Sequence, residues 1–243
     1  MEHRLSATGT RGPLSTALSG ARESARAALM ADIKFRSARD QQLIDEDRVE
    51  EYVQSLVQGG VDGFSVVTEP HHFGGSLALA ARVRSATTLP IIRKEFFNSL
   101  EQIDESAAAG FNAVQLTISV IKQLDLIERM AGRAVDLGLE VIICIQDRTE
   151  LKQALALGAT IIGINNRDIL SLETDNGTVS RTESLMPFMP DEVLVISESS
   201  MLSTAELKRV VSAGIDGVLI GTAFAKSVDQ VALAREFHKA LKK

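Results

Sequence analysis

The fold is decided by a repeated unit that is plainest in the stretch GGVDGFSVVT, residues 59–68. Its two leading glycines mark the end of a helical segment, because glycine readily takes the left-handed conformation that follows a last helical turn. Residues 64–68 then form a short, nearly continuous apolar run, which is typical of a parallel strand covered on both faces. The stretch therefore predicts a helix that turns directly into a buried strand.

The same unit recurs along the chain. Helix stops of this kind also lie at residues 109–112 and 213–217. Strand candidates alternate with helix-length segments, and they cover residues 28–34, 64–68, 91–94, 113–117, 139–145, 160–165, 193–198 and 217–221. An open doubly wound sheet usually carries a glycine-rich dinucleotide loop after its first strand, whereas residues 34–39, KFRSAR, contain no glycine.

We therefore predict an α/β fold, a (β/α)8 TIM barrel that forms a single domain over residues 21–243. Residues 1–20 are rich in Ser, Thr, Gly and Arg and show little hydrophobic period. We expect them to form a loose N-terminal arm outside the core.

Composition and charge argue against several classes of partner. Apolar residues make up 45% of the 243 residues and charged residues 24%, the balance of a globular protein with a sizeable core. A net charge of −6 with mixed signs argues against a nucleic-acid groove or an anionic membrane surface. The single cysteine, Cys144, excludes an internal disulfide framework, and no early apolar stretch has the length of a membrane span. We expect a cytoplasmic protein that binds neither nucleic acid nor membrane.

Polar residues stand where the apolar runs end, and in a barrel those ends meet at one mouth. These residues are Asp32, Lys34, Lys94, Asn165, Arg167, Glu198 and Thr222. Only every second residue of a barrel strand points inward. The last inward positions are Lys34, Lys94, Cys144, Asn165 and Glu198. Two lysines near an acid could donate protons, hold a substrate carboxylate or form a Schiff base, so an enzyme is the favoured interpretation.

Hydroxyl residues and glycine follow the last two predicted strands. Ser199 and Ser200 follow the seventh strand, and Gly221 and Thr222 follow the eighth. Barrels of this class often hold a phosphate at these two loops with backbone N–H groups and hydroxyls. Ser37, after the first strand, could supply a further hydroxyl. This pattern predicts a phosphorylated ligand.

Several other residues have two interpretations each. The adjacent histidines in EPHH, residues 69–72, lack an accompanying acidic triad, so a loop is favoured over a metal site. Cys144 has no histidine at a comparable strand end, which favours a small apolar filler over a nucleophile. Arg167 either clamps a carboxylate or pairs with Asp168, and Asp32 either takes part in the chemistry or pairs with Lys34.

From residue 28 to the end the chain resembles the indole-3-glycerol-phosphate synthase family, barrel enzymes that close the indole ring in tryptophan synthesis. The resemblance rests on the motifs DIKFRS (32–37), SVVTEP (65–70), FGGS (73–76), RKEF (93–96), IGINNRD (162–168), ISES (196–199) and GT (221–222). It implies a lyase that acts on 1-(2-carboxyphenylamino)-1-deoxyribulose 5-phosphate, with ring closure and loss of carbon dioxide and water. It implies no metal and no organic cofactor, and it allows association with other enzymes of the pathway.

The resemblance also implies a role for each matching residue. Lys94 would be the general acid at the ketose oxygen, and Lys34 would hold the substrate carboxylate and assist dehydration, beside the acid Asp32. Asn165 and Glu198 would position the hydroxyl and amine groups of the substrate. Other substrate contacts would come from Arg167 at the carboxylate and from Phe73, Phe96, Gln115 and Cys144 around the aromatic ring. The phosphate would be bound by Ser37, Ser199, Ser200, Gly221 and Thr222.

The chain departs from the family's pattern at several of these positions. Cys144 stands where the family carries a glutamate that acts as general acid or base, and Gln115 stands at an aliphatic position near the aromatic ring. The smaller departures are Asp32 for glutamate, Glu95 for aspartate, Ser200 for glycine, Ala38 for proline, and an amino-terminal extension shortened to about thirty residues. Loss of an acid can cost roughly two to four decades of rate.

Three interpretations follow from these departures. The chain is the synthase itself, a diverged paralogue that acts on another sugar-phosphate adduct, or a non-catalytic barrel that binds a phosphorylated metabolite. Retention of both Lys34 and Lys94 argues against the last, because a protein that merely binds has little use for two costly buried cations.

Overall fold

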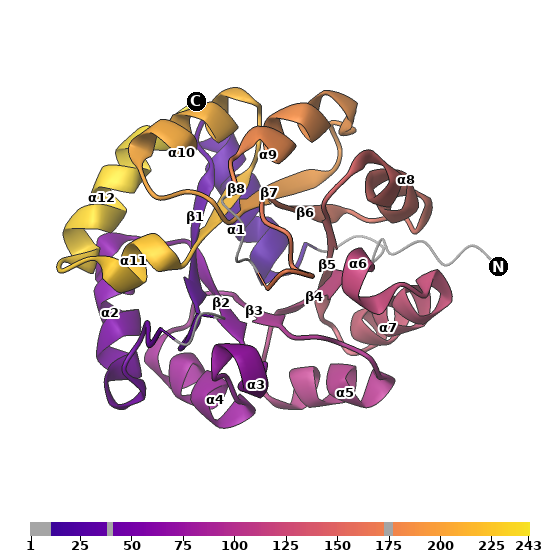
Figure 1. Ribbon diagram of the computed structural model, residues 1–243, viewed down its shortest axis with the longest axis horizontal. Helices are drawn as coiled ribbons and strands as arrows, with labels where there is room; N and C mark the ends of the chain where they lie inside the picture. Colours follow the sequence, from indigo (N-terminus) through magenta and orange to yellow (C-terminus); the bar gives the residue numbers. More distant parts are fainter. Residues whose placement is uncertain (1–10, 38–40, 173–176) are drawn as a thin grey trace.

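The computed structural model describes residues 11–37, 41–172 and 177–243. In this part of the chain the parallel strands pair in sequence order and close into a barrel, with β1 hydrogen-bonded to β8 (Figure 1). The strands are β1 Ala28–Ile33, β2 Gly63–Val67, β3 Ile91–Lys94, β4 Ala113–Thr117, β5 Glu140–Ile145, β6 Ile161–Asn165, β7 Leu194–Glu198 and β8 Gly217–Ile220. The predicted (β/α)8 barrel is confirmed, and each predicted strand end lies within one residue of the observed end.

Helices surround this barrel as a ring (Figure 1). The longer ones are α2 Val49–Gly59, α4 Leu77–Ala86, α5 Leu100–Ala108, α7 Leu124–Asp136, α8 Arg148–Ala156, α9 Ser180–Leu185, α10 Thr204–Ser212 and α12 Gln230–Ala240. Shorter turns of helix are η1 Glu46–Arg48, α3 Pro70–Phe73, α6 Ile118–Ile121, η2 Met186–Phe188 and α11 Thr222–Lys226. The predicted helix stops are confirmed, since Gly60, Gly110 and Gly214 have φ angles of 92°, 78° and 100°.

The apolar core has two parts that follow the alternation of the strands. On β1, Leu29, Ala31 and Ile33 face outward and pack in the large cluster between the strands and the helices. Ala28 and Met30 face inward, into a smaller cluster inside the barrel. The smaller cluster also contains Ile92, Ala113, Ile142, Ile161, Ile196 and Leu219. The barrel interior is therefore filled at one end and open to polar residues at the other.

Residues 13–23 form a helix, α1 (Pro13–Glu23), which lies across the centre of the ring of strands in Figure 1. Leu14 and Leu18 are fully buried in the cluster inside the barrel. Glu140, the first residue of β5, accepts hydrogen bonds from the backbone N–H groups of Leu14 at 2.7 Å and Ser15 at 2.8 Å. This contact places α1 at the amino-terminal ends of the strands, on the side of the barrel away from the mouth.

The prediction of a loose arm over residues 1–20 is therefore wrong from residue 13 onward. Helix α1 has few large apolar residues, and Leu14 and Leu18 are one turn apart on one face, so the barrel supplies the surface that makes this short helix stable. The first ten residues of the predicted arm, and the departure at Ala38, lie outside the described residues.

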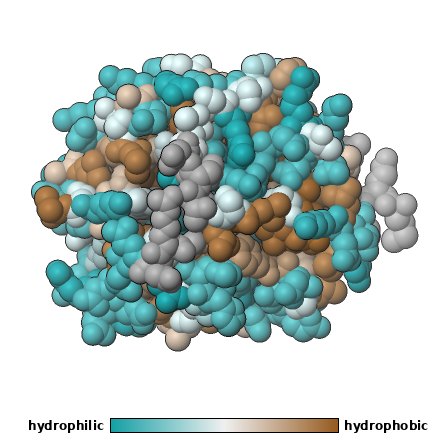
Figure 2. All heavy atoms as spheres, viewed as in Figure 1, coloured by the Kyte–Doolittle hydropathy of each residue, from teal (hydrophilic) through white to brown (hydrophobic). Residues whose placement is uncertain are grey.

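The surface shows mixed character. On the face seen in Figure 2, hydrophilic residues predominate and hydrophobic areas are scattered between them. Within the described ranges, no helix has the length and apolar character needed to span a membrane.

Candidate active site

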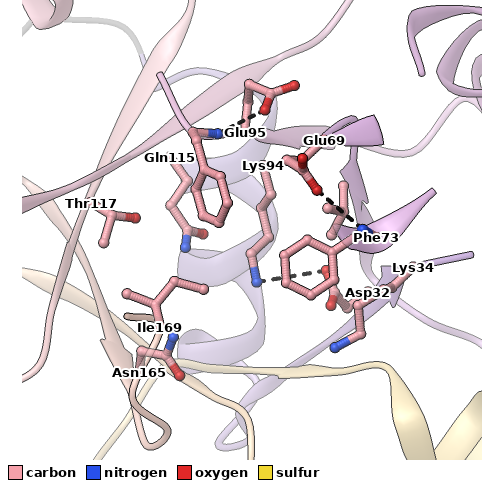
Figure 3. A pocket seen from close by; sticks show the side chains of 12 residues that line it. Asp32, Lys34, Glu69, Phe73, Lys94, Glu95, Gln115, Thr117, Asn165 and Ile169 are labelled. Carbon is pink, nitrogen blue, oxygen red and sulfur yellow. Dashed lines mark hydrogen bonds and ion pairs between the residues drawn. The ribbon is translucent and has the colours of Figure 1, made fainter. Parts of the chain in front are cut away.

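Two adjoining cavities lie at the carboxyl ends of the strands, and both are lined by Asp32, Lys34 and Lys94. The first cavity is also lined by Val67, Glu69, Phe73, Glu95, Phe96, Gln115, Thr117, Asn165 and Ile169 (Figure 3). The second is also lined by Arg167, Ser199, Ser200, Met201, Leu202, Leu219, Ile220, Gly221 and Thr222. A ligand that occupies both cavities must pass the two lysines.

Lys94, the last residue of β3, is the centre of an ionic cluster inside the mouth. Its Nζ lies 3.4 Å from Oε2 of Glu198, at the end of β7, and 3.8 Å from Oδ1 of Asp32, near the end of β1. Ser65 on β2 donates a hydrogen bond to the same oxygen of Asp32. The lysine side chain is 15% exposed, so its ammonium group is screened from water on most sides. The predicted convergence of these strand ends is found in the structure.

Glu198 is the most buried acid of this cluster, with 1% of its surface exposed. Burial raises the pKa of its carboxyl group above the ordinary value of 4.5, while Lys94 and a hydrogen bond from Gln115 act in the opposite direction. Nε2 of Gln115, on β4, donates that bond to Oε2 of Glu198 over 3.0 Å. Glu198 is thus a buried carboxyl group in contact with an ammonium group, and it holds its proton more tightly than an exposed glutamate does.

Aromatic rings form one wall of the first cavity. Phe73 and Phe96 pack edge to face with ring centroids 6.2 Å apart, and Nζ of Lys34 lies 5.5 Å from the centroid of the Phe73 ring. Phe73 is held by Glu69, whose carboxylate accepts hydrogen bonds from backbone N–H groups of α3 and caps that helix. The result is an apolar slot, lined on one side by these two rings and with a cation at its edge, which suits an aromatic ring bearing a carboxylate.

Residues 70–72 of the EPHH segment belong to the short helix α3 and do not form the predicted loop, because Pro70 and the Glu69 cap favour a helical start. Both histidines belong to this helix. The described ranges contain no group of three or more His, Cys, Asp and Glu side chains placed to hold a metal ion.

The second cavity is lined by backbone as well as by hydroxyl groups. Ser199 and Ser200 both have left-handed backbones, with φ angles of 65° and 61°, which is uncommon for serine. Ser200 Oγ is buried and finds no hydrogen-bond partner among the described residues. Gly221 approaches β1 so closely that a side-chain carbon there would lie 3.1 Å from the carbonyl oxygen of Asp32. These features suit a compact, oxygen-rich anion such as a phosphate.

Two residues predicted for the site, Ser37 and Arg167, do not lie where they were expected. Ser37 is not among the lining residues, and its Oγ accepts a hydrogen bond from the backbone of Gln41 instead. Arg167 lines the second cavity with the serine loop, away from the aromatic slot where its predicted partner, the ring carboxylate, is expected.

Cys144 lies in the barrel layer beneath the first cavity. The residue is 1% exposed and lies opposite Thr117 of the neighbouring strand β4. Burial raises the pKa of the thiol well above its ordinary value of 9.0, and Glu198 nearby raises it further. The thiol is therefore neutral at physiological pH, which fits a filler of the barrel layer better than a nucleophile.

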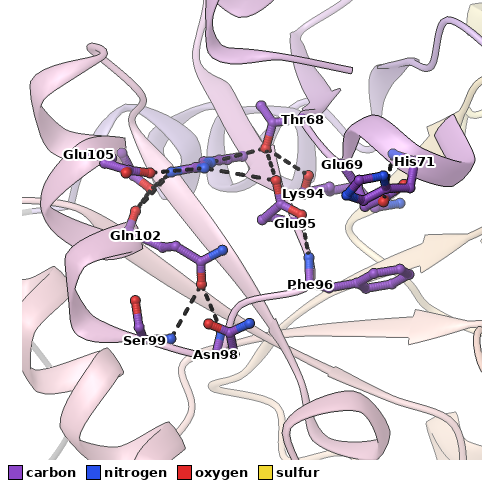
Figure 4. Close-up of polar contacts among 12 residues, drawn as sticks. Thr68, Glu69, His71, Lys94, Glu95, Phe96, Asn98, Ser99, Gln102 and Glu105 are labelled. Atoms are coloured by element: carbon purple, nitrogen blue, oxygen red, sulfur yellow. Dashed lines mark hydrogen bonds and ion pairs between the residues drawn. The ribbon is translucent and has the colours of Figure 1, made fainter. Parts of the chain in front are cut away.

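Sequence reasoning assigned no role to the hydrogen-bonded side chains on either side of Lys94, namely those of Arg93 and Glu95. Glu95 accepts hydrogen bonds from Thr68 Oγ1 at 2.7 Å and from the backbone N–H of Phe96 at 2.8 Å (Figure 4). Arg93, which is 3% exposed, donates to Thr68 at 3.0 Å and to the backbone carbonyl of Gln102 at 2.8 Å. Strand parity is a signal for this network, because a residue next to an inward lysine must point outward.

The comparisons with known proteins agree with this geometry. The family model described as "Indole-3-glycerol phosphate synthase" matches residues 4–237. A protein of that name from Thermococcus kodakarensis is 35% identical over 86% of this chain and 90% of its own length. Those from Pyrococcus abyssi and Pyrococcus furiosus are 34% and 33% identical, over 87% and 90% of this chain and 91% and 95% of their own lengths.

Among solved structures, a designed cube-shaped protein cage made by fusing symmetric oligomeric domains aligns with a TM-score of 0.61 at 18% identity. The alignment covers 88% of this chain and 72% of the cage chain, and at this identity it supports the fold alone. Family membership rests on the sequence matches, which span nearly the whole chain at about one third identity. The chain belongs to the indole-3-glycerol phosphate synthase family.

Proposed function

We propose that this chain closes the pyrrole ring of 1-(2-carboxyphenylamino)-1-deoxyribulose 5-phosphate, with release of carbon dioxide and water. Membership of the family makes it a decarboxylating carbon–carbon lyase. The observation that carries the proposal for this chain is the position of Lys94 where the two cavities meet, 3.4 Å from Glu198 and 3.8 Å from Asp32. A lysine placed there can reach a ketose whose two ends occupy the two cavities.

The cavities suggest how the substrate lies. Its phosphate binds between the Ser199–Ser200 loop and Gly221–Thr222, where Arg167 adds a positive charge. Its aromatic ring lies in the first cavity against the wall formed by Phe73 and Phe96, and Lys34 at the edge of that wall faces the ring carboxylate.

The reaction then needs two proton donations. The ring carbon that bears the carboxylate attacks the ketose carbon while Lys94 protonates the ketose oxygen, and carbon dioxide leaves from the same ring carbon. The new hydroxyl group then departs as water with a proton from Lys34, and loss of a proton from the neighbouring carbon completes the indole. Asn165 and Glu198 hold the hydroxyl and amine groups through these steps.

The neutral thiol of Cys144 cannot take the part of the glutamate found there in the family. Glu198 is buried, carries a raised pKa and contacts Lys94, so we propose that it exchanges the protons that the missing glutamate would exchange.

A second candidate is a lyase or cyclase of the same type that acts on another sugar-phosphate adduct. Two observations favour it, both at the bottom of the first cavity: Cys144 supplies no acid, and Gln115 brings an amide into a place that an aliphatic side chain would keep apolar. The phosphate loop and both lysines serve either substrate.

Turnover of the carboxyphenylamino-deoxyribulose phosphate by purified protein, followed by the fluorescence of the indole product, tests the proposal. Cys144→Glu restores the acid, and Cys144→Gln is its matched control because it has the same shape without the charge. Efficient conversion by the wild type supports the proposed reaction. Conversion by Cys144→Glu alone supports the second candidate, and no conversion by any of the three proteins overturns the proposed function.

The cellular setting is part of the proposal. We place the reaction in tryptophan biosynthesis in the cytoplasm, with a phosphorylated small molecule as substrate and without a metal or organic cofactor. Family membership supports the biosynthetic role and the phosphorylated substrate.

A further inference from the structure

Gln115 carries a polar group into the part of the site expected to hold the aromatic ring. Its side chain points inward from β4 and lies near Lys94, Thr117 and Asn165 in the first cavity (Figure 3). The residue is 4% exposed, so water has little access to its amide. A buried amide must find partners for both its N–H2 group and its oxygen, or the unsatisfied atom destabilises the site.

The Gln115–Glu198 hydrogen bond fixes which way this amide faces. Oε2 of Glu198 accepts a hydrogen bond from Nε2 of Gln115 at 3.0 Å, and Nζ of Lys94 lies 3.4 Å from the same oxygen. The ammonium group of Lys94 can only donate, so the carboxyl oxygen beside it is an acceptor and needs an N–H group from the amide. The amide therefore presents Nε2 to Glu198 and directs Oε1 away from it.

Oε1 of Gln115 is buried, and no hydrogen-bond donor among the described residues reaches it. The hydroxyl group of Thr117, two residues further along the same strand and also at the cavity wall, forms no hydrogen bond to Oε1. Lys94 and Asn165 also line this cavity and carry N–H groups, but neither forms a hydrogen bond to Oε1. Phe96 and Ile169 bring no side-chain donor. A ligand in the first cavity can therefore supply the donor that Oε1 lacks.

We infer that Oε1 of Gln115 accepts a hydrogen bond from a hydroxyl or amino substituent on the aromatic ring of the substrate. This inference rests on the proposed function, and it narrows the substrate to a ring-substituted carboxyphenylamino-deoxyribulose phosphate. An unsubstituted ring offers a C–H edge to Gln115 and leaves Oε1 without a partner when water is displaced. A site built to hydrogen-bond a substrate group discriminates strongly against the analogue that lacks it.

The test compares kcat/KM for the unsubstituted substrate with kcat/KM for its hydroxyl-, amino- and methyl-substituted analogues, prepared at each free ring position. The methyl group controls for size because it fills a similar space without donating. We expect the wild type to prefer a hydroxyl or amino analogue over the methyl analogue of the same position by at least about tenfold. The position that shows the preference identifies the ring edge next to Gln115.

Gln115→Leu removes the acceptor and also the hydrogen bond to Glu198, which lowers turnover of every analogue. The ratio between hydroxyl and methyl analogues cancels that common loss, and we expect it to fall to about one in this variant. Gln115→Met, which is unbranched, provides the same comparison if Gln115→Leu does not fold.

Three outcomes have distinct meanings. A donor preference in the wild type that disappears in the variant supports the inference. Turnover of the unsubstituted substrate with no donor preference, or a preference that survives in both variants, overturns the inference and leaves the proposed function standing. Absence of turnover with every analogue overturns both.

Discussion

The two ends of the barrel differ in how closely their charged groups are paired. At the amino-terminal ends of the strands, Glu140 caps helix α1 at 2.7 and 2.8 Å, and Asp216 accepts two hydrogen bonds from Arg22 at 2.6 and 2.5 Å. Each carboxylate there has specific donors at short distance. At the mouth, Lys94 is shared between two acids at 3.4 and 3.8 Å.

The mouth also holds left-handed backbone and unsatisfied polar atoms. Ser199 and Ser200 at the mouth both keep left-handed conformations, which cost about 1–3 kcal/mol each for residues other than glycine. Ser200 Oγ and Gln115 Oε1 are buried there without a partner among the described residues. The closed end pairs Glu140 and Asp216 with close donors, whereas the mouth keeps polar atoms that a ligand can satisfy.

Lys94→Ala tests the role of the mouth, and we expect it to have the largest effect of these variants, a loss of turnover. The change removes the proton donor and leaves Glu198 buried without its cation, so we expect kcat/KM to fall by roughly 10²- to 10⁴-fold. Steady-state assays with the proposed substrate measure it, and the exposed Lys208→Ala provides a matched control. Turnover that survives in Lys94→Ala would show that the site assignment is wrong.

At the closed end we expect the opposite response, a loss of stability without a loss of chemistry. Leu18→Ala leaves a cavity between α1 and the inner cluster, and such changes typically lower the free energy of unfolding by about 2–5 kcal/mol. Chemical denaturation measures the change, and Thr16→Ala, exposed on the same helix, is the control. A fall in kcat at a temperature where the variant is fully folded would contradict the division between the two ends.

The smallest expected effect concerns the pH dependence of stability at the mouth. Burial raises the pKa of Glu198 above 4.5, so the folded state binds its proton more tightly than the unfolded state does. The resulting stabilisation is fully present below pH 4.5 and is lost as the pH rises through the raised pKa. Lys94 and Gln115 lower the same pKa, so they oppose the effect of burial and keep this stabilisation small.

Glu198→Gln removes this titration. We therefore expect the free energy of unfolding of the wild type to fall relative to that of Glu198→Gln as the pH rises from about 4.5. Urea denaturation at a series of pH values measures the difference between the two curves. A difference with the opposite sign would mean that Lys94 outweighs burial and holds the pKa of Glu198 below its ordinary value.

Part of the site could be predicted from the sequence, because successive side chains of a strand point to opposite faces of the barrel wall. Lys94, Asn165 and Glu198 were expected inside the barrel mouth, and they lie there. Ser37 could not be placed in this way, because it lies in a loop after β1 and its hydroxyl bonds to Gln41. The same limit applies to Arg167, which follows β6 and lines the second cavity.

The sequence by itself determined the barrel and the convergence of its strand ends. Apolar runs of strand length, glycine helix stops and alternating side chains act over a few residues, so the order of residues specifies them directly. Only the tertiary structure decided that residues 13–23 form a helix, since Leu14 and Leu18 gain their burial from strands far along the chain. Only the tertiary structure decided that Gln115 bonds to Glu198, a contact across 83 residues, and turns its oxygen away from that bond. Local patterns set which elements form, whereas the pairing of polar groups depends on distances that exist once the barrel has closed.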